Sequence, residues 1–434
     1  MKVAIVGAGI AGLTCALRLS ERHDVTLFER EPHAGGKIRS QRVDDFLFEW
    51  GPHSFLSSSQ PLVRLVDELA LEKRVQPAAA ASHRYIYYGG RMQRMPSKPP
   101  EALTFSLLSA GGKARALREI FAPVPPEQSD ESVDEFFRRR FGAQVAERVV
   151  APALLGITGG DAATTEVGAL FPRLPLLERS YGSVIRGAMR NRRKPGRLLG
   201  FGADGMSALT DALAARIGDR LRLDCAVNAV RLRDGGWHID HRHGRYDADA
   251  VVLCTPSHRA AELVERFDAT LAALLRQIEY APMRVAGIAF RKSELSAPPD
   301  GLGFLAARGQ GIRILGALYT SSTFPAQAPP ESLYLRVFLG GSSDPQALDL
   351  SPQQARATVL KDLATTLGIR ASPIAYHEVL WRRAIPQYAI GHGVLVTEIE
   401  RRAGTHAGLI LTGNAYRGVS LSDTVDNANA CSTF

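Results

Sequence analysis

The sequence predicts a mixed α/β fold that begins with a Rossmann-like βαβ unit, and three observations within residues 1–30 support this prediction. Residues 3–6 form a short apolar run typical of a buried strand, and residues 24–28 are predicted to form a second strand. Between them, the run G-x-G-x-x-G is followed by apolar residues at helical spacing. An acidic residue, Glu29, stands directly after the second strand.

The turn between the first strand and the helix predicts a dinucleotide site. Its glycines permit a tight turn, close approach of the backbone to a pyrophosphate, and close packing of helix on strand. The helix N-terminus offers free N–H groups to that pyrophosphate, and Glu29 can accept hydrogen bonds from a ribose. The alternative is a glycine-rich turn in an unrelated α/β fold. The candidate binding residues are Glu29 together with Gly7, Ala8, Gly9, Ile10, Ala11 and Gly12.

The residues after Glu29 favour FAD over NAD. The segment from Arg30 through Gly35-Gly36-Lys37 resembles the second motif, E-R-x-x-x-x-G-G-[RK], of the flavin amine oxidase superfamily. Adjacent glycines let the chain pass close to a cofactor, and Lys37 or Arg39 can balance its phosphates. The alternative for the two glycines is an ordinary turn. The run Gly51-Pro52-His53-Ser54 extends the match.

Length, charge and cysteine content narrow the setting. A chain of 434 residues predicts two or three domains. No apolar run reaches the length of about 18 residues that a membrane-spanning helix needs, and glycines interrupt the first twenty residues, which therefore do not read as a signal peptide. Four widely spaced cysteines favour a reduced, cytoplasmic setting. A net charge of +9 favours anionic substrates or an anionic membrane surface, and nucleic acid is the weaker alternative.

Downstream elements follow in order. An amphipathic helix is expected over 60–74 and a hairpin over 83–95 with a Gly89-Gly90 turn. Residues 96–200 are predicted to be helical and interrupted by prolines, with a capping box that begins at Ser132.

The second half returns to alternating elements. Asp204 is expected to cap a helix that ends near Ile217, and 221–232 to pair with 237–241 across Asp234-Gly235-Gly236. Residues 250–255 and 409–414 are predicted buried strands, and residues 256–375 alternate helix and strand patterns. A last helix is expected from about Ser422 to Phe434.

The chain as a whole resembles the oxygen-dependent protoporphyrinogen oxidases and their coproporphyrinogen-oxidising relatives, within the flavin amine oxidase superfamily. The run Ile385-Pro386-Gln387-Tyr388 with Gly391-His392, and the segment Gly413–Asp423, are the most diagnostic. The other matching segments are Val6–Gly12, Gly35–Lys37, Glu49–Phe55, Arg84-Tyr85, Gly156–Asp161 and Ser322–Pro325.

The resemblance implies an architecture and a set of FAD contacts. It implies a Rossmann-like FAD domain of the amine oxidase/p-hydroxybenzoate hydroxylase type (1–80, 201–255 and 376–434), a sheet-based substrate domain (81–95 and 256–375) and a helical membrane-binding insertion (96–200). Strand packing is the alternative for Val227, whose backbone would hold the adenine, and a core aromatic is the alternative for Trp381. Beyond residues 7–12 and Glu29, the implied FAD contacts are Arg30, Gly36, Lys37, Gly51, Pro52, His53, Ser54, Val227, Trp381, Gly413, Val419, Ser420 and Leu421.

Three residues are implied for the substrate pocket: Arg84 as a propionate partner, and Leu305 and Phe324 as the residues that sandwich the macrocycle. The alternatives are a solvated strand residue for Arg84 and plain core for the other two. Thr158 departs from the family, because many relatives carry an aromatic residue there.

The implied reaction is the six-electron oxidation of protoporphyrinogen IX to protoporphyrin IX in haem biosynthesis, in three two-electron cycles that each reduce O2 to H2O2. We find no Ser-His-Asp set or metal-ligand spacing, as expected where a flavin carries the chemistry and no residue of the chain is catalytic. The alternatives are coproporphyrinogen III oxidation, another flavin amine oxidase or desaturase, and a non-enzymatic escort-type protein of the same fold. A downstream chelatase is a further implied partner.

Peripheral attachment to the inner membrane is expected through residues 173–197. This segment contains eight basic residues and a single acidic one, with apolar residues between them. Such a pattern suits the surface of anionic lipid, where each basic residue contributes about 1 kcal/mol to the free energy of binding. A solvated basic loop is the alternative. The apolar residues are Leu174, Leu176, Leu177, Tyr181, Val184, Ile185 and Met189.

Overall fold

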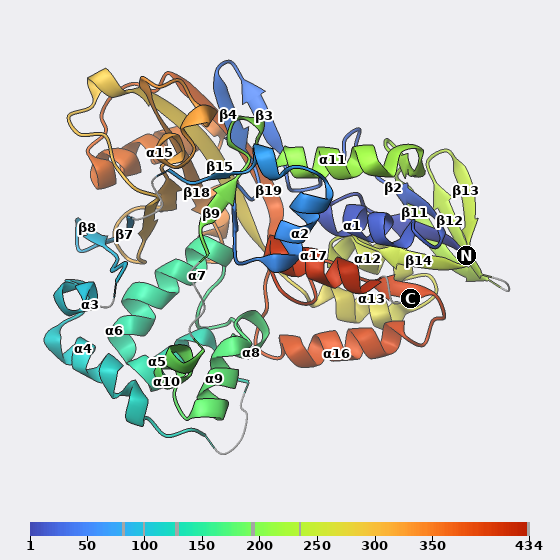
Figure 1. The fold of residues 1–434 in the computed structure, drawn as a ribbon, viewed down its shortest axis with the longest axis horizontal. Coiled ribbons are helices and arrows are strands. Elements are labelled where there is room, and N and C mark those ends of the chain that lie inside the picture. The colour runs from blue at the N-terminus through green and yellow to red at the C-terminus, as the bar shows by residue number, and fades with distance from the viewer. Residues whose placement is uncertain (80–82, 99, 126–129, 192–195, 234–235, 432–434) are drawn as a thin grey trace.

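The computed structural model describes residues 1–79, 83–98, 100–125, 130–191, 196–233 and 236–431. It confirms the predicted mixed α/β class. Figure 1 shows a block around a parallel sheet, which carries both chain termini, a second block around a larger sheet, and a block of short helices beside them.

A parallel sheet of five strands forms the first block, in the order β10-β2-β1-β14-β20. Strands β1 and β2 pair in register from Lys2 opposite Asp24 to Val6 opposite Phe28. Their apolar residues are buried on both faces because helices cover both sides, as parallel sheets require. The strands are β1 (Lys2–Val6), β2 (Asp24–Phe28), β10 (Leu221–Arg222), β14 (Ala250–Leu253) and β20 (Leu409–Leu411).

Two apolar clusters hold helices to this sheet. One joins it to α1 (Ile10–Leu19), α2 (Gln60–Glu68), α11 (Ser207–Ile217) and α17 (Leu421–Ala430). The other joins it to α12 (Ser257–Val264), α13 (Ala269–Arg276) and α16 (His392–Ala403). The antiparallel strands β11 (Val227–Arg233) and β12 (Gly236–His241) contribute to this second cluster, and β13 (Gly244–Ala248) pairs with β12.

A mixed sheet of seven strands forms the second block, in the order β19-β15-β18-β17-β16-β7-β8. One face packs with α15 (Pro352–Leu367), and the other packs against Phe46, Phe48 and Trp50. Its strands are β7 (Arg84–Tyr88), β8 (Arg91–Arg94), β15 (Tyr280–Arg291), β16 (Gly303–Ala306), β17 (Ile314–Leu318), β18 (Ser332–Gly340) and β19 (Ala375–Pro386), and α14 (Thr320–Thr323) follows β17.

Short helices make up the third block, as the prolines predicted. Ser132 and Glu135 form the predicted capping box at the start of α5. Arg140 and Glu119 form an ion pair whose side chains are fully buried. The elements are α3 (Glu101–Thr104), α4 (Ala110–Leu117), η2 (Arg118–Phe121), α5 (Val133–Phe141), α6 (Ala143–Val145), η3 (Ala146–Val150), α7 (Ala151–Thr158), α8 (Val167–Leu170), α9 (Arg173–Tyr181) and α10 (Val184–Arg190).

Small sheets connect the blocks. Strand β9 (Leu198–Gly200), which follows the helical block, pairs with β5 (Phe55–Leu56) and with β6 (Gln76–Pro77). Strands β3 (Ser40–Val43) and β4 (Phe46–Glu49) form a hairpin. Residues on either side of the helical block are therefore neighbours in space.

Most predicted local elements are present, including the Gly89-Gly90 hairpin. Two predictions were wrong in detail. The helix from residue 60 ends at Glu68, because Ala70 has a positive φ of 54° and a separate turn, η1 (Glu72–Arg74), follows. Asp204 does not cap the next helix: it lies in η4 (Gly202–Asp204) and pairs with Arg74, 2.7 Å away.

Other predictions are refined. The expected strand 221–232 is two strands, since β10 joins the parallel sheet while β11 pairs with β12. The expected boundary at residue 376 falls on β19, which pairs with β15 in the seven-stranded sheet. The turn residues Asp234 and Gly235 and the chain end at Phe434 lie outside the described residues.

The contact between α1 and the turn before it predicts one substitution effect. A Cβ on Gly12 would overlap the carbonyl oxygen of Gly7, whereas a Cβ on Gly9 would meet nothing within 4 Å. We expect Gly12→Ala to lower the free energy of unfolding by about 1–3 kcal/mol or more. Gly9→Ala should leave this free energy almost unchanged. Denaturant unfolding of the two variants measures the difference, and equal midpoints would contradict the expected steric contact.

Candidate functional site

The predicted turn after β1 forms, with Glu29 beside it. Gly7 has φ of 100°, and its N–H donates to the Phe28 carbonyl at 2.8 Å. The Glu29 carboxylate is buried and accepts hydrogen bonds from the N–H of Ala8 at 2.7 Å and of Glu31 at 3.0 Å. The acid is therefore held at the strand end, next to the first glycines.

The second glycine pair lies against the first turn. The Gly35 N–H donates to the Ala8 carbonyl at 2.8 Å, and a Cβ on Gly36 would lie 3.2 Å from the Cα of Gly9. The two motifs are thus brought into backbone contact. Arg30 points away, with a mostly exposed side chain that pairs with Glu31 at 3.0 Å.

Lys37 follows that pair and is a half-buried cation without a carboxylate partner among the described residues. Its Nζ donates to the Ala384 carbonyl and lies 5.2 Å from the ring centroid of Tyr280. Burial lowers the pKa of the Lys37 ammonium to about 8. A phosphate brought by a ligand would supply the missing negative charge.

The run from Gly51 packs on this lysine segment. A Cβ on Gly51 would overlap the Lys37 carbonyl, so only glycine allows the approach. Burial, assisted by the charge of Arg336, lowers the pKa of His53 to about 3, so this imidazole is neutral. The Ser54 hydroxyl lies 3.4 Å from His53 Nε2.

The segment after β20 borders the same strand ends. Gly413 has φ of 127° and nothing within 4 Å of its Cβ position. Ser420, between Val419 and Leu421, caps α17 in a capping box with Asp423. The carboxyl ends of β1, β2, β14 and β20 thus carry the expected cofactor segments, which is where ligands bind in open α/β sheets.

These residues fit a dinucleotide. Nothing lies within 4 Å of the Cβ positions of Gly9 and Gly413, so there is open space over both residues that a ligand can occupy. The buried Thr255 Oγ1 and Tyr416 hydroxyl have no partner among the described residues. Together with the uncompensated Lys37 and the carboxylate at the strand end, they offer what a pyrophosphate and a ribose need.

Two expected cofactor residues lie further from the turn. Val227 begins β11, and its carbonyl accepts from Arg259 at 2.6 Å. Trp381 lies on β19, and its indole N–H donates to the Trp50 carbonyl at 2.9 Å, next to Gly51. Their contact with FAD stays a prediction.

The three expected substrate residues do not share one surface. Arg84 is exposed on β7, and Leu305 on the adjacent β16 pairs with Ile86, so both lie on the same face of the sheet. Phe324 is only 2% exposed and packs on Gly200, with its ring 6.2 Å from that of His53.

The run Ile385–His392 is diagnostic of the family, but the sequence alone did not predict a structural or chemical role for it. Gln387 donates to the Thr158 carbonyl at 3.0 Å, Tyr388 donates to the Asn414 carbonyl at 2.8 Å, and His392 Nε2 lies 2.9 Å from the Tyr416 carbonyl. The Tyr388 and His392 rings stack 4.0 Å apart. The run thereby ties α7 to the loop after Gly413. The sequence also did not predict that Arg336 lies beside this site, where it donates to the Gly51 carbonyl.

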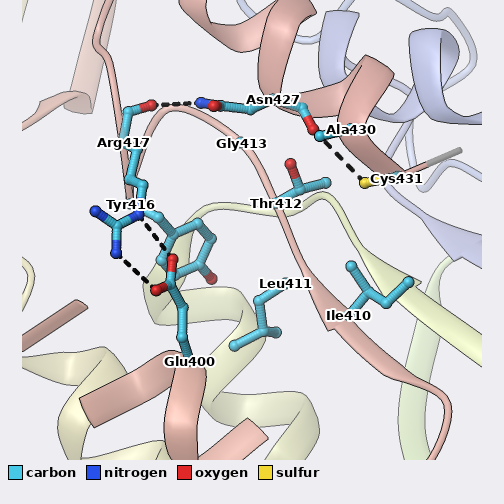
Figure 2. A pocket seen from close by; sticks show the side chains of 10 residues that line it. All are labelled: Glu400, Ile410, Leu411, Thr412, Gly413, Tyr416, Arg417, Asn427, Ala430 and Cys431. Carbon is cyan, nitrogen blue, oxygen red and sulfur yellow. Dashed lines mark hydrogen bonds and ion pairs between the residues drawn. The ribbon is translucent and has the colours of Figure 1, made fainter. Parts of the chain in front are cut away.

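A cavity of about 370 Å³ lies between α16, β20 and α17 (Figure 2). An ion pair of Glu400 with Arg417 and a hydrogen bond from Asn427 to the Arg417 carbonyl border it. Among the expected cofactor residues it includes only Gly413, so we do not assign the cofactor to this cavity.

Comparisons with known proteins show the family to which the chain belongs. A family model described as flavin-containing amine oxidoreductase matches residues 10–430. Protoporphyrinogen oxidase 1 from Arabidopsis thaliana is 30% identical over 98% of this chain and 86% of its own length. Coproporphyrinogen III oxidase from Bacillus subtilis is 28% identical over 99% of this chain and 96% of its own length.

Solved structures show the same fold. A crystal structure from Exiguobacterium sp. 255-15, provisionally described as a protoporphyrinogen oxidase, has a TM-score of 0.87 at 26% identity and covers 100% of this chain and 98% of that chain. Cyclohexylamine oxidase from Brevibacterium oxydans has a TM-score of 0.73 at 16% identity, with 100% and 98% covered, which shows likeness of fold alone.

The open space over Gly9 generates a prediction for cofactor binding. Gly9→Val should fill the space that a pyrophosphate needs while leaving the fold intact, since Gly9 has an ordinary φ of −70°. We expect a folded, colourless protein, measured by circular dichroism and visible absorbance. A variant that purifies with full flavin content would contradict the assignment.

Proposed function

Because the chain belongs to the flavin-containing amine oxidoreductase family and uses FAD as its cofactor, we propose that it oxidises a porphyrinogen in tetrapyrrole biosynthesis. The proposed reaction is the six-electron oxidation of protoporphyrinogen IX to protoporphyrin IX, with O2 as acceptor and release of H2O2. The observation that carries the proposal is the match with a protoporphyrinogen oxidase over 98% of this chain.

The protein's own part is binding and orientation. FAD, when bound, supplies the chemistry by accepting electrons from a substrate carbon and passing them to O2. Lys37 and the N–H groups at the start of α1 would hold the pyrophosphate, and Glu29 the ribose. The 51–54 run and Trp381 would border the ring. No described side chain is assigned as an acid or base.

Arg84 would hold a propionate from its exposed position on β7, next to the edge strand β8 of the seven-stranded sheet. Its side chain forms no ion pair with any described residue, so its charge is available to a carboxylate. Leu305 would contact the macrocycle from the neighbouring strand. Phe324 could do so only if its ring, now packed on Gly200, became accessible.

A second substrate, coproporphyrinogen III, is the main alternative, favoured by the match with the Bacillus subtilis enzyme. It carries four carboxylates where protoporphyrinogen carries two, and each carboxylate taken into an apolar pocket needs a cation. An amine oxidase or desaturase activity, or a non-enzymatic escort role, shares the fold and stays a lesser alternative.

We expect protoporphyrinogen IX to be oxidised with the higher kcat/KM. The measurement is a steady-state assay with both porphyrinogens, followed by porphyrin fluorescence. Arg84→Ala should raise KM for the substrate and leave the flavin content unchanged, because four strands separate Arg84 on β7 from Trp381 on β19 in the sheet. A higher kcat/KM for coproporphyrinogen would reverse the preference, and no porphyrin from either substrate would reject the proposed function.

We also propose that the helical block attaches the protein to anionic membranes. Several large apolar residues are exposed there, and Phe121 is 81% exposed at the end of η2, which packs against α10. Arg186 of α10 lies over the Phe121 ring at 6.0 Å. Basic and apolar groups side by side suit the surface of anionic lipid. The other exposed apolar residues of the block are Leu103, Leu117, Val124, Ile157, Leu176 and Met189.

The expected membrane segment is corrected in part. Leu177 and Val184 are buried in the core of the helical block, so they are not available to lipid, whereas Leu174 and Tyr181 pack against that core and stay partly exposed. Of the basic residues in the segment, 192–194 lie outside the described residues. Within the described residues, none of the helices has the length and apolarity needed to cross a bilayer.

Vesicle flotation tests this attachment. We expect binding to vesicles that contain anionic lipid, and weaker binding by the double variant Leu117→Ser/Phe121→Ser. The matched control is Val394→Ser, since Val394 is 67% exposed but lies on α16 outside the block. Equal flotation with neutral and anionic vesicles, or equal loss in the control, would contradict the proposal.

A further inference from the structure

A buried arginine on β18, Arg336, carries a charge that the described part of the protein does not neutralise. The residue is only 4% exposed. Its guanidinium donates to the Gly51 carbonyl, while its Nε has no partner and no described carboxylate forms an ion pair with it. A buried cation left in this state is costly unless something else supplies negative charge.

The groups around Arg336 compensate its charge only in part. Glu49 is the nearest acid, but its carboxylate accepts from Ser40 Oγ and from the Met206 N–H, both at 2.7 Å. Burial raises the pKa of Glu49 to about 7, so near neutral pH it is partly protonated. Burial lowers the pKa of Arg336 only to about 10, so the guanidinium stays charged. Tyr334 and His53, which also face it, are neutral at this pH.

The same sheet contains a second buried arginine for comparison. Arg284 on β15 is 3% exposed. Arg336 pairs with Gly287, and Arg284 is three positions from Gly287 along the strand, so Arg284 lies on the opposite face of the sheet. Arg284 pairs with Glu378 at 2.5 Å and donates to the Leu350 carbonyl at 2.6 Å. One buried arginine is therefore neutralised by the protein and the other is not.

The position of Arg336 relates it to the cofactor segments. Along β18, Tyr334, Arg336 and Phe338 face the same side of the sheet, toward the cluster of Phe48 and Trp50. The Gly51 carbonyl that accepts from Arg336 belongs to the residue that packs on Lys37. The guanidinium thus lies against the run that borders the flavin site.

We propose that Arg336 is the protein's counter-charge for the flavin ring when the ring is reduced. A hydride brings two electrons and one proton, so its transfer from a substrate carbon to the neutral oxidised ring leaves one negative charge there. Arg336 offers a fixed positive charge in a site shielded from water, where it acts without reorganisation. The inference rests on FAD binding and not on the identity of the substrate.

The experiment uses the FAD-loaded enzyme without substrate. Arg336→Gln keeps an N–H donor for the Gly51 carbonyl and removes the charge, whereas Arg336→Lys keeps the charge. The readouts are the reduction potential of the flavin and its affinity for sulfite, an anion that adds to the ring and leaves negative charge on it. We expect a more negative potential and sulfite binding weaker by about tenfold or more in Arg336→Gln, and values near wild type in Arg336→Lys.

Arg284→Gln is the matched control, because it removes an equally buried arginine from the same sheet and should leave both readouts unchanged. Unchanged potential and sulfite affinity in flavin-loaded Arg336→Gln would overturn the proposal. So would a raised KM for a porphyrinogen at unchanged potential, since Arg336 would then hold a substrate carboxylate.

A second measurement applies if Arg336→Gln does not retain flavin. In Arg336→Lys, a buried ammonium loses its proton at lower pH than a guanidinium. The potential of this variant should therefore fall below that of wild type as the pH rises through 8 to 10. Parallel curves for the two proteins over this range would overturn the proposal.

Discussion

Two backbone contacts that only glycine allows determine the geometry of the proposed cofactor site. Gly12 lets α1 pack on the Gly7 carbonyl, and Gly51 lets the 51–54 run pack on the Lys37 carbonyl. The first contact aims the start of α1 at the end of β1, and the second brings the large sheet to the same place through Trp381 and Arg336. The turn after β1 and the seven-stranded sheet therefore both contact the backbone around Lys37 and Gly51.

Two positively charged side chains beside this backbone lack a negatively charged partner within the described part of the protein. Lys37 is half-buried and Arg336 is buried, and neither has a carboxylate partner among the described residues. Elsewhere the protein neutralises its buried cations, as Arg140 with Glu119 and Arg284 with Glu378 show. Since unpaired buried charge is destabilising, we propose that a cofactor with a pyrophosphate and a reducible ring would supply the missing negative charge.

The diagnostic run Ile385–His392 acts as a structural connection. Gln387 reaches the end of α7 in the helical block, while Tyr388 and His392 hold carbonyls of the loop after Gly413. The seven-stranded sheet, the helical block and the loop after Gly413 are thereby joined within eight residues.

The amino-acid sequence alone specified the βαβ unit, its glycines, Glu29 and the Gly89-Gly90 hairpin, because periodicity and turn chemistry act over a few residues. It missed the end of α2 at Glu68 and the role of Asp204, where a positive φ at Ala70 and a long-range pair with Arg74 decided the outcome. Only the tertiary structure separated Leu177 and Val184 from the exposed Phe121, since burial depends on the packing of distant helices. Only the tertiary structure, likewise, left Arg336 without a carboxylate partner among the described residues, because no local pattern on a strand tells a neutralised arginine from an uncompensated one.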